Sequence, residues 1–335
     1  DNGGGGGNIT DLASGGSHTL LSSGTDGCIH VFDIRQPTIA QTFSLPRKGE
    51  KSLSVSLGYD GLLAAVGSST AHIHFHDLRN NGALLGSYKD AHTDEVTQVR
   101  FQNRQDSNNN QTTTPLLISA SEDGLACVFD TSQPSEEAAL KSVLTVGTSL
   151  REVGFFGPSL EGVYCLTGSE TMSVWHHDSA QRICDFGTDL RSKLSHLVGH
   201  DDNDNMMMMI DYLVDCHWDA RQQRLSLLAG NPSGDAAVFQ VNAGSISLLH
   251  TLHGGHHGVV RACCYASSSS GLFVTGGEDA RLCEWNPCIS NTAPRIGGGN
   301  QQLQRHNNNE TKGHATTTKR GPVRRTKKKN SSNPY

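Results

Sequence analysis

The 335-residue chain is poor in hydrophobic residues, which make up only 35% of it. No apolar run approaches the roughly 20 residues that a membrane-spanning helix needs, so we expect no membrane partner. Apolar residues also lack helical spacing, which favours an all-β fold. Neither a GxxxxGK[ST] loop nor a GxGxxG turn opening a helix is present. Without such phosphate-binding loops, the sequence predicts no cofactor.

The nine cysteines include no CxxC pair. Their odd number and irregular spacing argue against the disulfide framework of a secreted protein. Several lie in predicted strands, where we expect them to be small buried side chains in a reducing, intracellular compartment. These are Cys28, Cys127, Cys165 and Cys283.

The net charge of −6 is unevenly distributed, because residues 311–335 carry eight Lys or Arg and no acidic residue. An acidic body argues against sequence-specific nucleic-acid binding. The basic tail is a candidate nuclear localisation signal, with a weak RNA contact or a solvated tail as alternatives. We therefore expect a nuclear or nucleo-cytoplasmic protein. The tail residues are Lys319, Arg320, Arg324, Arg325, Lys327, Lys328 and Lys329.

Low-complexity segments divide the chain. We expect residues 1–7 to be a disordered Gly-rich leader and residues 291–335 a disordered polar linker with the basic tail. Residues 8–290 would form the folded domain. Within it, the Asn/Thr-rich run near 107–114, the Met run at 206–209 and the Ser run at 267–270 are interpreted as insertions outside the core.

A repeated unit fills that domain: a strand, a tight turn with Asp or Gly, a second strand and an aromatic residue. It reads SSGTDGCIHVFD from Ser22, SASEDGLACVFD from Ser119 and TGGEDARLCEWN from Thr275. With three weaker copies, the aromatic-like positions are Phe32, His76, Phe129, Trp175, Phe239 and Trp285. The spacings are 44, 53, 46, 64 and 46. Without the insertions, they approach the roughly 40–45 residues of a propeller blade.

The repeat predicts a β-propeller of four-stranded antiparallel blades. D-G turns between short β-prone segments indicate hairpins, and VTQVRF at 96–101 alternates apolar and polar residues as a strand does. Six blades are visible. We expect seven in the intact protein, the last formed by residues 8–21 or by a segment upstream.

The copies resemble WD-repeat proteins, whose blades carry Gly-His before the first strand, Ser/Thr on the second, Asp in the turn and Trp on the third. The last copy matches fully, and two others match in part. The residues that would form this structural tetrad are His256, Thr275, Asp279 and Trp285, then His92, Ser119, Asp123 and Phe129, and finally Ser22, Asp26 and Phe32.

A closer resemblance, over most of residues 18–290, is to the WD-repeat-containing protein 89 family. It is carried by AHTDEVTQVRF, SASEDGLACVFD, DYLVDCHWD, GGHHGVVRACCY and TGGEDARLCEWNP, followed by a basic tail. The resemblance implies little about function beyond the fold. Because propellers present a rim and a central channel mouth to peptides or domains, we expect a non-catalytic scaffold for protein–protein interactions, monomeric within a larger complex.

Two sets of residues suggest chemistry instead. His256, Thr275 and Asp279 have the composition of a hydrolase triad, but a buried structural network explains them better, so we predict no enzyme. His72, His74 and His76 alternate along one strand face and are a weak candidate for a zinc site. The alternative for these three is a half-exposed strand with its polar side chains facing outward, and we predict no metal.

The segments VFDIR and FHDLR place Asp33 two residues before Arg35 and Asp77 two residues before Arg79. They resemble the WDxR motif of propellers that are substrate receptors on the adaptor of a cullin–RING ubiquitin ligase, although Phe32 and His76 replace the Trp. Arginine suits such an interface, because its planar group forms paired hydrogen bonds. The alternative is a local ion pair at each strand end.

Overall fold

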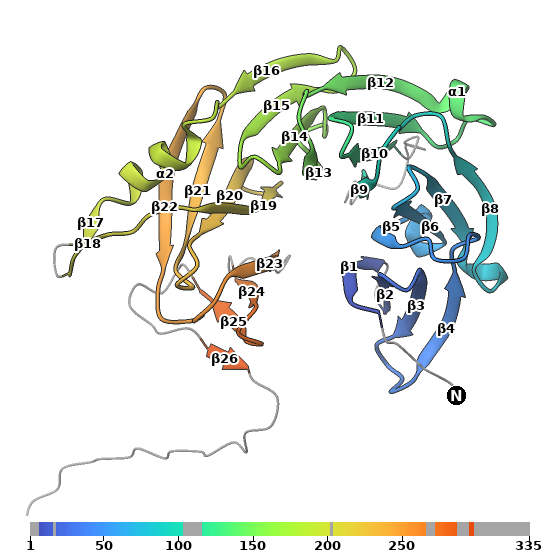
Figure 1. The fold of residues 1–335 in the computed structure, drawn as a ribbon, viewed down its shortest axis with the longest axis horizontal. Coiled ribbons are helices and arrows are strands. Elements are labelled where there is room, and N and C mark those ends of the chain that lie inside the picture. The colour runs from blue at the N-terminus through green and yellow to red at the C-terminus, as the bar shows by residue number, and fades with distance from the viewer. Residues whose placement is uncertain are drawn as a thin grey trace, which may run out of the picture. The chain divides into compact units, whose positions relative to one another are not determined.

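The computed structural model describes residues 7–15, 18–102, 116–201, 204–265, 272–286 and 295–297. Their strands form six four-stranded antiparallel sheets and one two-stranded hairpin (Figure 1). The predicted all-β propeller with four-stranded blades is therefore confirmed, and the described residues form six blades. No helix among these residues is long and apolar enough to cross a membrane.

The first three blades follow the chain in order. Blade 1 contains β1 (Ile9–Gly15), β2 (Thr19–Gly24), β3 (Cys28–Asp33) and β4 (Ile39–Ser44). Blade 2 contains β5 (Ser52–Gly58), β6 (Leu63–Ser68), β7 (Ile73–Asp77) and β8 (Ala83–Tyr88). Blade 3 contains β9 (Val96–Phe101), β10 (Leu116–Ser121), β11 (Leu125–Asp130) and β12 (Leu140–Thr145), with the short helix α1 (Glu136–Ala139).

The last three blades repeat the pattern. Blade 4 contains β13 (Leu150–Phe156), β14 (Gly162–Thr167), β15 (Met172–His176) and β16 (Gln181–Asp185). Helix α2 (Leu190–Val198) and the hairpin β17 (His200–Asp201) and β18 (Asp204–Met207) follow it. Blade 5 contains β19 (Tyr212–Asp219), β20 (Arg224–Gly230), β21 (Ala236–Asn242) and β22 (Ser245–Leu252). Blade 6 contains β23 (Val260–Tyr265), β24 (Phe273–Gly277), β25 (Leu282–Trp285) and β26 (Arg295–Gly297).

The tight turn between the second and third strands of a blade needs a residue with positive φ. Gly27 (φ 74°) and Gly124 (φ 82°) provide it in the D-G turns of blades 1 and 3. The Asp26 carboxylate accepts a hydrogen bond from the Cys28 N–H at 3.0 Å, which closes the first of these turns. The local sequence therefore sets each hairpin before any packing between blades.

Blades pack through their first strands, and β1, β5, β9, β13, β19 and β23 each contact the next. Each of these strands pairs with its neighbour through a register shift near its start, as in a β-bulge. The residue that follows the shift has the same place in every blade. We call these six residues the inner belt: Asp11, Ser54, Gln98, Glu152, Asp215 and Ala262.

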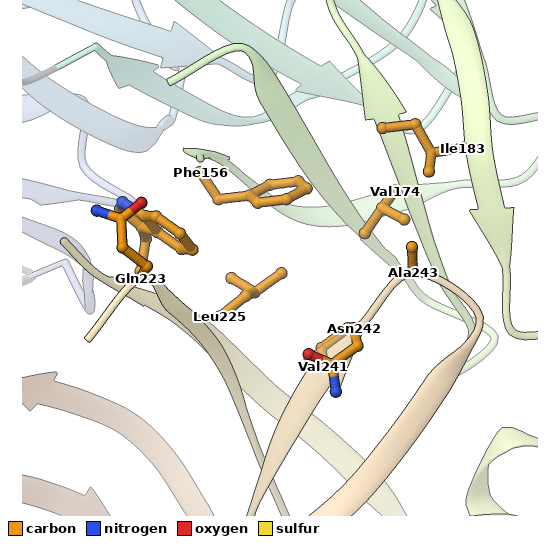
Figure 2. Close-up of a pocket in the computed structure, with 9 residues that line it drawn as sticks. Phe156, Val174, Ile183, Gln223, Leu225, Val241, Asn242 and Ala243 are labelled. Carbon is orange, nitrogen blue, oxygen red and sulfur yellow. The ribbon is translucent and has the colours of Figure 1, made fainter. Parts of the chain in front are cut away.

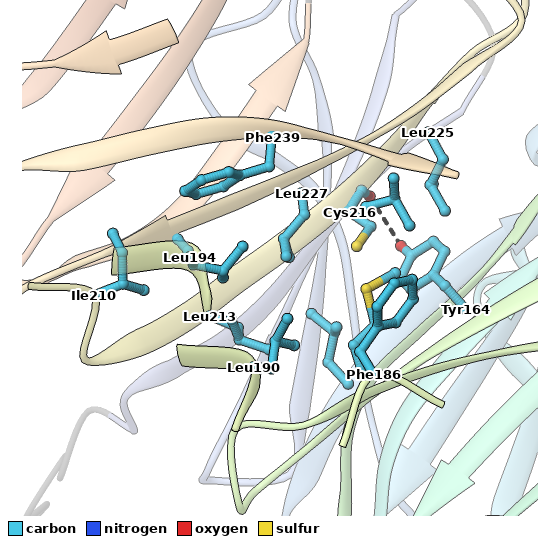
Figure 3. Packing of buried hydrophobic residues seen from close by; sticks show 14 of the residues in the cluster. Tyr164, Phe186, Leu190, Leu194, Ile210, Leu213, Cys216, Leu225, Leu227 and Phe239 are labelled. Atoms are coloured by element: carbon cyan, nitrogen blue, oxygen red, sulfur yellow. Dashed lines mark hydrogen bonds between the residues drawn. The ribbon is translucent and has the colours of Figure 1, made fainter. Parts of the chain in front are cut away.

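A large hydrophobic cluster lies between blades 4 and 5 (Figure 3). Phe186, Leu190 and Leu194 join it from the segment around α2, and Ile210 joins it after the hairpin. The expectation that the Met run at 206–209 lies outside the core is wrong at Met208, which packs against this cluster. The helix is also one that the search for helical spacing missed.

Two predicted boundaries differ from the structure. Residues 8–21 do not form a seventh blade, because β1 and part of β2 in blade 1 occupy them. The last blade extends past residue 290 to β26, whereas residues 291–335 were expected to be linker and tail. The basic tail itself lies outside the described residues.

Candidate functional site

The tetrad residues of blade 6 meet at one buried point. The two ring nitrogens of His256 lie 3.0 Å from Asp279 Oδ1 and 2.8 Å from Thr275 Oγ1. Trp285 Nε1 donates to the same Thr275 hydroxyl at 2.8 Å. Burial raises the pKa of Asp279, but hydrogen bonds from the His257 N–H and from His256 outweigh it and lower the pKa to about 2. The carboxylate therefore stays ionised and holds the loop before β23 against the sheet.

Blade 3 repeats this arrangement with one fewer hydrogen bond. His92 bridges Asp123 Oδ2 at 3.1 Å and Ser119 Oγ at 2.7 Å. Phe129 is fully buried at the Trp position and has no N–H to donate. Burial lowers the pKa of His92, against the attraction of Asp123, so a neutral imidazole is favoured.

Blade 1 does not assemble a tetrad around its predicted residues. Ser22 is buried, Phe32 is half-buried and Asp26 is exposed. Asp26 caps its own turn through the Cys28 N–H. The spacing of Ser22, Asp26 and Phe32 in the sequence therefore marks the hairpin of the blade and not its buried network.

The two Asp-x-Arg segments form matching ion pairs at the ends of β3 and β7. Arg35 donates to both carboxylate oxygens of Asp33 at 2.8 and 2.6 Å, and Arg79 donates to those of Asp77 at 3.0 Å each. The hydrogen bonds from Arg35 lower the pKa of Asp33 well below its usual range. The Arg35 and Arg79 side chains remain 64% and 67% exposed.

The two pairs occupy the same register position in neighbouring blades, because Asp33 lies opposite Thr19 and Asp77 lies opposite Leu63. The alternative of a local ion pair at each strand end is therefore present in the structure. Each Arg is held by a local ion pair, and each still presents an exposed guanidinium at the same turn of its blade.

The inner belt links adjacent blades by hydrogen bonds. A side-chain oxygen of one blade accepts from a backbone N–H of the next at three successive interfaces. The contacts are Val55 N to Asp11 Oδ2 (3.0 Å), Val99 N to Ser54 Oγ (3.1 Å) and Val153 N to Gln98 Oε1 (2.5 Å). The pattern stops after blade 4, where Cys216 N donates to the neighbouring Asp215 at 2.7 Å.

Charge along the belt is uneven. Arg100 in β9 donates to Asp11 Oδ2 at 2.8 Å, and this attraction outweighs burial and raises the Arg100 pKa. Burial and the nearby Asp215 raise the pKa of Glu152 to about 8, and burial also raises the pKa of Asp215. Burial therefore shifts two neighbouring carboxylates toward their neutral forms on the side of blades 4 and 5, although Arg100 opposes the shift.

Comparison with known proteins agrees with the tetrad geometry. The family model described as WD domain, G-beta repeat matches residues 3–33 and 246–286. The second match contains the complete tetrad of blade 6, from His256 to Trp285. This chain is a WD40-repeat β-propeller. The resemblance expected from the sequence is thereby confirmed.

Relatives of this WD40 propeller extend over most of the chain. It is 29% identical over 277 residues to the WD repeat-containing protein 89 homolog of Dictyostelium discoideum, covering 82% of this chain and 70% of that protein. It is 33% identical over 282 residues to the WD repeat-containing protein GTS1 of Arabidopsis thaliana, covering 80% of this chain and 66% of that protein. The chain thus spans about two thirds of the length of these relatives.

Blade 2 of the WD40 propeller replaces the tetrad with a different network. His72, His74 and His76 are all buried, so the alternative of an outward-facing polar strand is wrong. His74 Nε2 lies 2.9 Å from Oε1 of Glu50, which the sequence did not single out. His76 instead places Nδ1 2.9 Å from the Gly82 carbonyl oxygen. Burial raises the pKa of Glu50, but hydrogen bonds from Thr70 and His74 lower it to about 2.

An apolar pocket of roughly 170 Å³ lies where blades 4 and 5 of the propeller meet (Figure 2). Phe156 and Val174 line it from blade 4, and Leu225 and Val241 line it from blade 5. Ala243, in the exposed turn after β21, lies at its edge. Pockets for cofactors usually measure about 300–1,000 Å³, so this one suits a single apolar side chain.

The tetrad of blade 6 cannot act as a hydrolase triad in this WD40 propeller. Thr275 is 1% exposed, and its hydroxyl already bonds both His256 and Trp285. A nucleophile needs a free face toward a substrate. Glu50 and the belt residues were not predicted from the sequence, because the shared position of the belt residues follows from the register shift of each first strand, which only the strand pairing reveals.

Proposed function

We propose that this propeller is a non-catalytic scaffold that binds partner proteins. WD40 propellers generally have this role, and the tetrad residues of blades 3 and 6 are occupied by structural hydrogen bonds. The observation that carries the proposal is the apolar pocket between blades 4 and 5. It offers rigid walls to one aliphatic or aromatic side chain, which is the form that a binding hot spot usually takes.

The proposal is tested by filling the pocket from its edge. Ala243→Trp adds a large side chain at an exposed turn, while Ala138→Trp makes the same change at an exposed position of α1 in blade 3. Full-length protein carrying each change is purified from cells with its partners and compared with wild type by quantitative mass spectrometry. We expect Ala243→Trp to reduce recovery of specific partners roughly tenfold, since filling a hot spot costs 1.4 kcal/mol or more. If wild type and both variants recover the same amounts of every partner, the pocket is not a binding site for these partners.

A second candidate function is that of a substrate receptor on a cullin–RING ubiquitin ligase. It is favoured by the matching exposure of Arg35 and Arg79 at the same turn of adjacent blades. In this role, the ion pairs with Asp33 and Asp77 would hold each guanidinium ready for the adaptor, which lowers the entropy lost on binding.

The double variant Arg35→Ala/Arg79→Ala tests this candidate. Arg261→Ala is the matched control, because Arg261 is also exposed (61%) and bonded to an acidic side chain, Glu278. We expect the ligase adaptor to co-purify with wild type and the control but not with the double variant. If the adaptor co-purifies with none of the three proteins, the receptor candidate is contradicted and only the general scaffold function remains.

For localisation, we propose that the basic tail directs the chain to the nucleus. The proposal is supported by the concentration of Lys and Arg in residues 319–329. Changing Lys327, Lys328 and Lys329 to Ala should shift a fluorescently tagged full chain toward the cytoplasm. An unchanged distribution would contradict a signal at these residues.

A further inference from the structure

Blade 2 has a buried cluster where blades 3 and 6 have the tetrad. The strand pairing shows the equivalence: Val66 lies opposite His74, as Ser119 lies opposite Cys127 in blade 3. Val66 thus occupies the place of the tetrad Ser or Thr, and it has no hydroxyl. The carboxylate comes from the loop before the first strand, at Glu50, and the imidazole comes from the sheet, at His74. In the tetrad the imidazole comes from that loop and the carboxylate from the sheet hairpin, so the places of the two groups are exchanged in blade 2.

The cluster gathers three metal-ligating side chains. Glu50, His72 and His74 can place one ligand atom each within 4.8 Å of one another. Glu50 Oε1 lies 2.9 Å from His74 Nε2 and 4.0 Å from His72 Nδ1. Ligands around tetrahedral zinc stand roughly 3.3 Å apart, given Zn–N distances near 2.0–2.1 Å. The observed separations bracket that value, so small side-chain movements would close the site.

Glu50 itself points to a missing partner. Its side chain is 0% exposed, and within the described part of the chain no hydrogen bond of ordinary geometry reaches its Oε2 atom, although the Ser68 hydroxyl lies close enough to contribute to the lowered pKa of Glu50. Leaving an ionised oxygen buried and unpaired is costly. In the tetrads of blades 3 and 6, by contrast, no side-chain oxygen or nitrogen of the described residues is left in this state.

The surroundings of His74 resemble the support of a metal ligand. Its Nδ1 lies 2.7 Å from the Ser87 hydroxyl on β8, which fixes the ring with Nε2 toward Glu50. Metal-binding histidines commonly use their second nitrogen in this way. Thr70 offers a further oxygen beside Glu50 and His72. His72 is 8% exposed and lies next to the half-buried turn between β6 and β7.

We propose that Glu50, His72 and His74 bind a divalent transition-metal ion of the zinc class. Two imidazoles and one carboxylate are a typical zinc ligand set, whereas Mg²⁺ and Ca²⁺ prefer oxygen ligands alone. The ion would supply the contact that Oε2 of Glu50 lacks among the described residues. It would thereby fasten the loop before β5 to the sheet, as the tetrad does in blades 3 and 6. This role is structural and separate from the proposed binding of partner proteins.

The test uses the full chain stripped with a chelator, then titrated with Zn²⁺ and Co²⁺. We expect one Zn²⁺ per chain that competes with a chromophoric chelator, an intense visible Co²⁺ spectrum typical of tetrahedral coordination, and a Tm rise of roughly 5 °C at a hundredfold excess over Kd. His72→Gln and Glu50→Gln should each lose all three signals. His76→Phe should keep them, because it places at this position the ring that blade 3 has at Phe129.

Two controls separate loss of the metal site from misfolding of a variant and from metal binding elsewhere on the chain. The chain has 17 histidines, and others of them could also bind Zn²⁺. The site is therefore identified by the loss of metal binding in the variants, and not by the total amount of metal bound. Circular dichroism checks that each variant is folded, and if His72→Gln unfolds, Glu50→Gln decides the result alone. Absence of the Co²⁺ spectrum and of the Tm shift in wild type would overturn the proposal and leave Glu50 and His74 as a charge pair. So would an unchanged stoichiometry in folded Glu50→Gln.

Discussion

Buried polar side chains are paired in two different ways in this protein. One way is seen in the tetrads of blades 3 and 6, and the other in the carboxylate clusters of blade 2 and of the inner belt. In the tetrads, every side-chain nitrogen and oxygen has a partner. In blade 2, one oxygen of Glu50 has none among the described residues, and in the belt burial raises the pKa of both Glu152 and Asp215 although Arg100 opposes it. The comparison suggests that the first kind of network stabilises the blade, while the second keeps capacity for an ion or a proton.

The largest effect is expected from removing the shared hydroxyl of blade 6. Thr275→Val keeps the shape of the side chain but leaves His256 and Trp285 each with a buried unpaired nitrogen. We expect the free energy of unfolding to fall by about 2–3 kcal/mol, measured by urea denaturation. Thr251→Val, at an exposed position of β22, is the control and should change it by less than about 0.5 kcal/mol. Equal effects would mean that the tetrad adds nothing to stability.

Blade 3 should show a smaller loss for the same kind of change. Ser119→Ala leaves only one nitrogen, His92 Nε2, without its hydrogen-bond partner, because Phe129 has no N–H that could lose one. The expected decrease is about 1–2 kcal/mol by the same measurement. Ser245→Ala, at an exposed strand end, serves as control. A loss larger than that of Thr275→Val would show that Trp285 is not the source of the difference between the blades.

The belt predicts a dependence of stability on pH. The folded-state pKa of Glu152 is about 8, above its ordinary value, so the folded state binds more protons than the unfolded state between about pH 5 and 8. Stability should therefore decrease as the pH rises from about 5 to about 8, and level off above pH 8. Glu152→Gln should remove this decrease and stabilise the protein by about 1 kcal/mol at pH 9, measured by urea denaturation at pH 6 and 9. Glu137→Gln, at an exposed site in α1, should leave the slope as in wild type.

The smallest effect is expected in blade 2 when a chelator is present. In Glu50→Gln, the amide oxygen can still accept from Thr70 and His74, and the amide nitrogen takes the place of the unpartnered oxygen. The free energy of unfolding should fall by about 1 kcal/mol, because Gln keeps the hydrogen bonds and loses only the charge that the folded state favours. A decrease of about 3 kcal/mol in the free energy of unfolding would instead indicate that other side chains already compensate the Glu50 charge. The blade 2 network would then be fully paired, as the tetrads are.

Much of the fold could be predicted because each hairpin is encoded locally. The Ser–Asp–aromatic spacing and the D-G turns indicate four-stranded blades, and the described residues form six of them. The tetrad of blade 6 could be predicted for the same reason, since all four residues lie within one repeat. Helix α2 escaped because its apolar residues, Leu190 and Leu194, face a cluster built by two blades and form only a short pattern.

The Glu50 cluster and the belt could not be derived in this way, because their partners come from separate segments. Glu50 lies 24 residues from His74, in a loop with no repeated signal. Arg100 reaches Asp11 across 89 residues. Such contacts depend on which strand edges meet after the blades have packed. A single copy of the repeat contains no information about that.

The direction of the belt hydrogen bonds has a consequence for how the protein is made. At the first three interfaces, the acceptor lies in the earlier blade and the donor in the later one. A ribosome releases the chain from its N-terminus, so a completed blade offers an oxygen to the strand that emerges next. Asp11, Ser54 and Gln98 thus act as successive docking points for nascent chain, and assembly can proceed in the order of synthesis.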